Sequence, residues 1–199
     1  DERNDYVYKF VSAGTYNPAN AAANANLLDT GTLYVGKFEA GAAAGDRMGT
    51  GSWVPLVFGS NGLDAGNGFT SQADVLIRAR QAADRVGATM MDRPEWVAAN
   101  PKKAGEVYVT LTNNNRRGGT TSNNADGSTT AGSARPPVDA GNPRIDNRYG
   151  HILRWNEDGG DVGATSFAWD IFVECGDKAT ALVPPERYQG NIVGDDLGA

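Results

Sequence analysis

Short runs in which apolar and polar residues alternate recur along this chain and are its clearest structural pattern. Tyr6, Tyr8 and Phe10 fall on one face of the first run. A period of two residues is typical of half-buried β-strands. It predicts an all-β fold with strands at 5–12, 32–40, 53–58, 105–113, 149–155 and 165–174.

The spacing of turn residues and a weak internal repeat extend this prediction. Asp158-Gly159-Gly160-Asp161 is a turn signal, and it predicts a hairpin over 149–174. An apolar pair, a cation and an aromatic residue recur in YVYKF (6–10), LYVGKF (33–38) and ILRW (152–155). Recurring short strands favour part of a β-propeller over a single sandwich, although strand periodicity alone does not decide between them.

One α-helix interrupts the strand pattern at 70–87. It begins at Thr70 or Ser71, carries Asp74 in its first turn and ends at Gly87. Its apolar stripe is predicted to cover a sheet or blade edge and consists of Val75, Leu76, Ala79, Ala83 and Val86.

A long loop insertion is predicted over 112–148. The segment is rich in Gly, Ser, Thr, Asn and Pro and lacks the apolar residues of a core. A loop of this length is often functional, and its Asn residues could offer amide oxygens to calcium. The composition favours the simpler interpretation, a solvated excursion.

Composition excludes several classes of function. The 199 residues carry 18 basic and 24 acidic side chains, a net charge of −6, so we expect no nucleic-acid partner. No apolar run reaches the length of a transmembrane segment. With Cys175 as the one cysteine, no disulfide forms within the chain, and a zinc site built from several His or Cys is excluded.

The segment ATMMDRPEWVA (88–98) holds the candidate chemistry. Charged residues between Met91 and Trp96 are costly to desolvate unless they are paired or bind a ligand. If the backbone is extended, Arg93 and Glu95 point the same way with Pro94 between them. The two side chains then form either a structural ion pair or a site for an anion held with a metal ion, and the residues alone favour the ion pair.

Two further residues are predicted to be structural. His151 is the one histidine and lies within a strand pattern, where a hydrogen-bonded structural histidine is the usual finding. Cys175 is interpreted as a small buried residue rather than a thiolate ligand.

Several stretches in the same order resemble the PhoX alkaline phosphatase family of bacteria. The resemblance extends from about residue 5 to 194, and its most distinctive segments are MDRPEW (91–96), VTLTNN (109–114) and YGHILRW (149–155). It implies a large β-propeller that hydrolyses phosphate monoesters with iron and calcium as cofactors. It also implies that Arg93 binds the substrate phosphate as a catalytic residue and that Glu95 is a metal ligand.

Members of that family are several times longer than this chain. The resemblance therefore implies that 1–199 is a partial β-propeller domain, a fragment that needs the remaining blades and is inactive alone. Family members are exported folded through the twin-arginine route, which implies a periplasmic or extracellular location with the signal outside this chain. The alternative is a non-catalytic, calcium-binding secreted or surface propeller of the same family.

Overall fold

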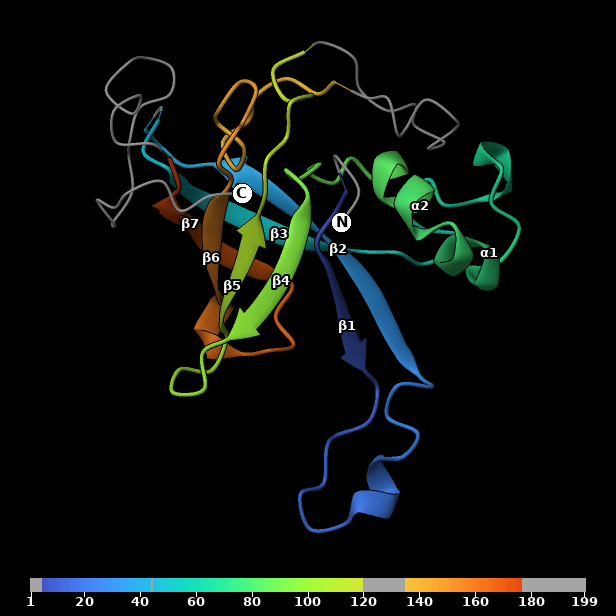
Figure 1. Ribbon diagram of the computed structural model, residues 1–199. Coiled ribbons are helices and arrows are strands. Elements are labelled where there is room, and N and C mark those ends of the chain that lie inside the picture. The colour runs from blue at the N-terminus through green and yellow to red at the C-terminus, as the bar shows by residue number, and fades with distance from the viewer. Residues whose placement is uncertain (1–4, 44, 120–134, 177–199) are drawn as a thin grey trace.

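A single antiparallel β-sheet dominates the computed structural model, which describes residues 5–43, 45–119 and 135–176. Its strand order is β1-β2-β3-β7-β6-β5-β4, and Figure 1 shows that the sheet is strongly curled. The strands are β1 (Tyr8–Ser12), β2 (Gly31–Ala40), β3 (Met48–Pro55), β4 (Pro94–Ala99), β5 (Glu106–Leu111), β6 (His151–Glu157) and β7 (Ser166–Glu174). The predicted all-β class is confirmed.

The strand pairing confirms the predicted hairpin, leaves the propeller untested and adds a strand that was not predicted. β6 and β7 pair antiparallel, as predicted for the hairpin over 149–174, and the 3-10 helix η4 (Asp158–Gly160) follows β6 directly. The described strands belong to one hydrogen-bonded sheet rather than to separate blades, so the propeller arrangement stays a prediction. β4 was not predicted, because its residues from Glu95 to Ala99 are all exposed and show no alternation.

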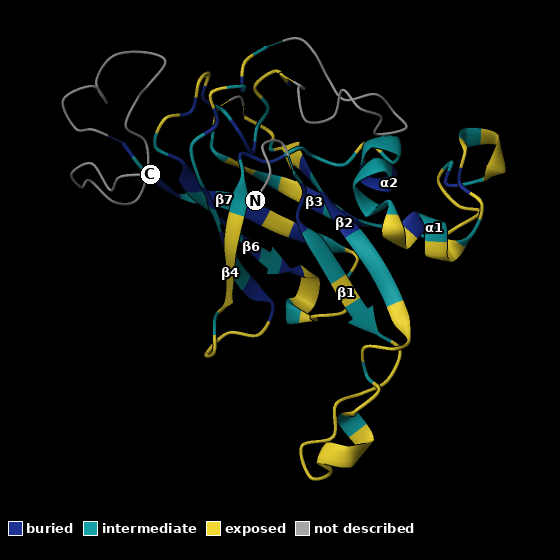
Figure 2. Cartoon of the chain, turned by 45° about the vertical axis from the view of Figure 1, so that its right-hand side comes forward, coloured by how far each residue is buried: buried dark blue, intermediate teal, exposed yellow. Residues whose placement is uncertain are grey.

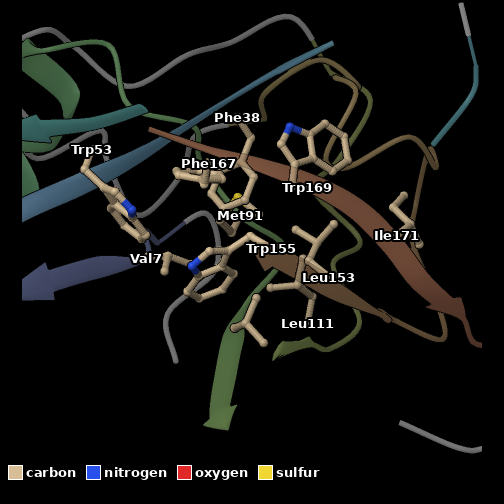
Figure 3. Packing of buried hydrophobic residues seen from close by; sticks show 11 residues of the cluster. Val7, Phe38, Trp53, Met91, Leu111, Leu153, Trp155, Phe167, Trp169 and Ile171 are labelled. Atoms are coloured by element: carbon tan, nitrogen blue, oxygen red, sulfur yellow. The ribbon is translucent and has the colours of Figure 1, made fainter. Parts of the chain in front are cut away.

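A core rich in aromatic side chains packs against the sheet (Figure 3). The rings of Phe38 and Trp53 lie 5.1 and 5.0 Å from that of Phe167, and Trp155 and Trp169 complete the group. β3 admits Phe167 because Gly51 stands opposite it, where a Cβ atom would overlap the ring. Burial of Phe167 alone stabilises the fold by about 1.5–3 kcal/mol.

A second core lies under two short helices, where one longer helix was predicted. α1 (Gln72–Ile77) and α2 (Ala79–Arg85) are separated at Arg78, whose φ of −103° and ψ of 39° are not helical. The predicted apolar stripe is therefore wrong at Leu76, which is 46% exposed. The buried residues of this core are Tyr6, Val35, Leu56, Leu63, Phe69, Val75, Ala82 and Ala83.

The predicted ends of the helical region are correct. The Ser71 side chain accepts a hydrogen bond from the amide of Asp74, and Gly87 follows α2 with a φ of +71°. Two further 3-10 helices are η1 (Ala21–Asn24) and η2 (Ala65–Asn67). η1 lies in the exposed connection between β1 and β2, which projects from the sheet (Figure 2).

One end of the sheet gathers the residues that matter for the site. Pro94 pairs with Leu111, Leu111 with His151, and His151 with Glu174. The four strands β4, β5, β6 and β7 therefore begin or end side by side at one end of the sheet. We call it the Pro94–Glu174 end. The loops that leave and enter these strands meet there.

Candidate functional site

The two described ends of the predicted long loop are packed into the Pro94–Glu174 end of the sheet. Residues 112–119 continue from β5, and residues 135–150 lead into β6. The prediction of a wholly solvated excursion is therefore wrong for these parts. Their buried polar side chains are those of Asn114, Arg117, Asn142, Arg144 and Asn147.

An ion pair between Asp92 and Arg117 forms the centre of this packing. Arg117 Nε lies 2.8 Å from Asp92 Oδ1, and both side chains are 0% exposed. The Asp92 carboxylate also accepts hydrogen bonds from the side-chain amides of Asn114 and Asn147, each 2.9 Å long. A buried carboxylate with three donors is compensated for its lost hydration.

Arg117 is compensated in the same way. Its Nη2 donates to the carbonyl of Met90 at 2.6 Å, and its Nη1 donates to the carbonyl of Pro137 and to Asp139 Oδ2. Desolvation raises the pKa of Asp139, although the nearby Arg117 opposes that shift. Arg117 thus joins the segment before β4 to both described parts of the loop.

His151 lies under this network and is structural, as predicted. Its Nε2 is 2.8 Å from the carbonyl oxygen of Gly141, which can only accept, so Nε2 carries the proton. Nδ1 then accepts from the side-chain amide of Asn147 at 3.2 Å. Complete burial lowers the pKa of His151 to about 4, against the opposing effect of Asp92, so the imidazole is neutral at pH 7.

Arg93 follows Asp92 and leaves the buried network. Its φ is +49°, so the extended backbone predicted at this residue is wrong. The strained turn is held by a hydrogen bond from the Arg93 amide to the Met91 carbonyl (3.0 Å) and by contacts from Thr112 to the Arg93 carbonyl. Positive φ at a non-glycine residue costs free energy and is concentrated at functional sites.

The guanidinium of Arg93 is fixed at one corner only. Its Nη1 donates to Asn113 Oδ1 at 2.7 Å, and the residue is half-buried. In the part of the chain that the structure describes, its Nε and Nη2 have no hydrogen-bond partner. These two donors form one edge of the planar group, which is the geometry that grips an oxyanion with two hydrogen bonds.

Glu95 lies apart from the buried network. It is exposed on β4, within the stretch from Pro94 to Val97 where the pairing with β5 shifts register. Arg93 and Glu95 form no ion pair in the described structure, so the structural ion pair suggested by the sequence is absent there. The described residues include no group of three or more His, Cys, Asp or Glu side chains that could hold a metal ion.

A second charged group lies at the same end, around the last residues of β7. Arg47 Nε is 3.2 Å from Glu174 Oε1, and Arg144 donates to the Cys175 carbonyl at 2.6 Å. Cys175 is half-buried rather than buried as predicted. Burial raises the pKa of its thiol, which disfavours the thiolate and agrees with the prediction that Cys175 is not a thiolate ligand. Arg47 and Asp139 also line a small cavity of about 280 Å³.

Fold and site together define an all-β protein that holds a strained arginine at one end of a curled antiparallel sheet. The family model described as "Alkaline phosphatase PhoX" matches residues 1–197, and the chain therefore belongs to the PhoX alkaline phosphatase family. This confirms the resemblance drawn from the sequence. No curated protein matches the chain.

One solved structure is similar over nearly the whole chain. It is "Pseudomonas fluorescens PhoX in complex with vanadate, a transition state analogue", with 46% sequence identity and a TM-score of 0.79. The match covers 93% of this chain and 29% of that protein, so this chain spans less than a third of its relative. None of the helices in the described residues is long and apolar enough to cross a membrane.

Proposed function

We propose that this chain forms part of a metal-dependent phosphomonoesterase, an alkaline phosphatase that releases inorganic phosphate from organic esters. The observation that carries the proposal is the state of Arg93: half-buried, held by Asn113 at one nitrogen, and with Nε and Nη2 lacking partners among the described residues. Membership of the PhoX family and the vanadate complex of the relative support it.

Arg93 is the substrate-binding and catalytic residue of this proposal. In phosphoryl transfer, negative charge spreads over the equatorial oxygens of the transferring group, and a fixed guanidinium stabilises it. Asp92 does not neutralise Arg93, because the Asp92 carboxylate is bound to Arg117, Asn114 and Asn147. The positive charge beside the buried network therefore stays available for an anion.

Glu95 is proposed as a ligand to iron or calcium. An exposed carboxylate suits a hard cation, but one carboxylate does not hold such an ion tightly, and the described residues do not by themselves make a site for an iron and calcium cluster. The further ligands must come from elsewhere in the protein. When bound, metal ions of this kind neutralise phosphate and polarise its oxygens.

The same proposal covers the whole protein. This chain is a partial β-propeller completed by the remaining blades, the whole protein acts outside the cytoplasm after folded export, and this chain alone is inactive. No specific observation favours the alternative of a non-catalytic, calcium-binding propeller: the described residues include no group of three or more His, Cys, Asp or Glu side chains that could hold a metal ion.

The test is to replace Arg93 by alanine in the full-length protein that carries this sequence, isolated with its metals. We expect kcat/KM for a phosphate monoester to fall about a hundredfold, the usual cost of one charge-stabilising contact in the transition state. Metal content should stay unchanged, because Arg93 binds no metal. Unchanged kinetics would show that Arg93 has no role with phosphate.

A further inference from the structure

Three consecutive residues after β5 hold two consecutive residues before β4. Thr112 contacts the carbonyls of Asp92 and Arg93 through its amide, Asn113 binds the Arg93 guanidinium, and Asn114 binds the Asp92 carboxylate. The pairing of Pro94 with Leu111 aligns the two segments.

The Asn113 contact differs from the other two. Thr112 and Asn114 bind the backbone and the buried carboxylate, and both therefore support the fold. Asn113 Oδ1 lies 2.7 Å from Nη1 of a half-buried guanidinium beside solvent, where it adds little to the core. Its effect is to fix the plane of a side chain whose long stem otherwise samples many rotamers.

The residue type also fits this effect. An amide oxygen accepts a hydrogen bond without carrying a charge, so Asn113 orients the guanidinium and leaves its positive charge intact. A carboxylate at the same place would orient it equally well, but it would neutralise the cation and repel an oxyanion.

We propose that Asn113 is a positioning residue for phosphate binding: its Oδ1 holds Nη1 of Arg93 so that the Nε and Nη2 edge meets the phosphate oxygens. The inference rests on the proposed function, because it gives Arg93 a phosphate to bind. It adds a residue that touches no substrate atom and acts through Arg93. Fixing the guanidinium before phosphate arrives removes an ordering cost from the binding step.

The experiment is a double-mutant cycle of Asn113→Ala and Arg93→Ala in the full-length metal-loaded protein, with a phosphate monoester as substrate and inorganic phosphate as competitive inhibitor. Asn113→Ala alone should lower kcat/KM and weaken phosphate inhibition about tenfold, as expected for a lost hydrogen bond to a charged group. In the Arg93→Ala background the same change should have no further effect. Asn113→Asp should also weaken phosphate binding, because it adds a negative charge while keeping the acceptor.

Asn115→Ala is the matched control, since Asn115 is exposed two residues along the same loop. We expect this variant to behave as wild type. Equal losses from Asn113→Ala in both backgrounds, or no loss in either, would overturn the positioning role. If Arg93→Ala itself leaves kinetics unchanged, the proposed function of Arg93 fails instead; if only Asn113→Ala is silent, the proposed function stands and this inference falls.

Discussion

Arg117 and Asp92 form an ion pair in which neither side chain reaches solvent, although 25 residues separate them in the sequence. This pair explains why an acid and a base stand together in the segment before β4. Asp92 turns inward to Arg117, and Arg93 therefore keeps its own charge for another partner. The site depends on this division between a buried structural residue, Asp92, and its half-buried neighbour, Arg93.

Arg117→Met should destabilise the fold strongly. Removing the cation leaves Asp92 buried without its charged partner, which typically costs about 3–5 kcal/mol. The measurement is urea unfolding, compared with Arg116→Met as control, because the neighbouring Arg116 is only half-buried and its side chain makes no ion pair within the described residues. Equal stability of the two variants would contradict the central role of the Arg117–Asp92 pair.

His151 should make the fold sensitive to acid. The folded-state pKa is about 4, below the ordinary value of 6.5, so the unfolded chain takes up a proton first as the pH falls. This residue contributes no pH dependence above about 6.5, and stability is lost between about pH 6.5 and pH 4, by roughly 3 kcal/mol in total.

His151→Gln provides the control for that prediction, since glutamine offers a donor and an acceptor but does not titrate. The difference in unfolding free energy between wild type and variant should shrink as the pH falls from 7 to 4. A difference that stays constant over this range would show that His151 is not held neutral.

Gly150 should be far less tolerant of substitution than Gly159. Both have positive φ, of +73° and +64°, and alanine in this conformation costs about 1–2 kcal/mol. A Cβ atom on Gly150 would also overlap the Leu111 carbonyl oxygen, whereas one on Gly159 meets nothing within 4 Å. Gly150→Ala should therefore cost about 2 kcal/mol more than Gly159→Ala in chemical unfolding, and similar costs would contradict the close approach of β5.

The strands that could be predicted from the sequence are those with one buried face. β6 is the clearest case, because the buried apolar residues Leu153 and Trp155 alternate with the half-buried polar residues Arg154 and Asn156. β4 could not be predicted in this way: it is an edge strand with Trp96 77% exposed and no alternation. The break at Arg78 was also missed, since both halves of the helix carry favourable helical residues.

The site was predictable only in part, for a related reason. Arg93 and Glu95 stood out because a proline separates two opposite charges, a local signal. Asn113 and Arg117 are 20 and 25 residues from their partners, inside a segment whose composition indicates solvent exposure. Pairing across such a separation is set by the register of β4 on β5, which no local pattern encodes.

The most direct test of the whole account is the inhibition constant of vanadate for the full-length protein with and without Arg93. Vanadate is described as a transition-state analogue in the complex with the Pseudomonas fluorescens relative. An interaction made in the transition state must be lost equally from kcat/KM and from binding of such an analogue. We predict that Arg93→Ala raises the vanadate inhibition constant about a hundredfold, in proportion to its loss of kcat/KM, while Asn115→Ala leaves both unchanged. Vanadate inhibition that is the same in the Arg93→Ala variant and the wild type would contradict the assignment of Arg93 as the phosphate-binding residue.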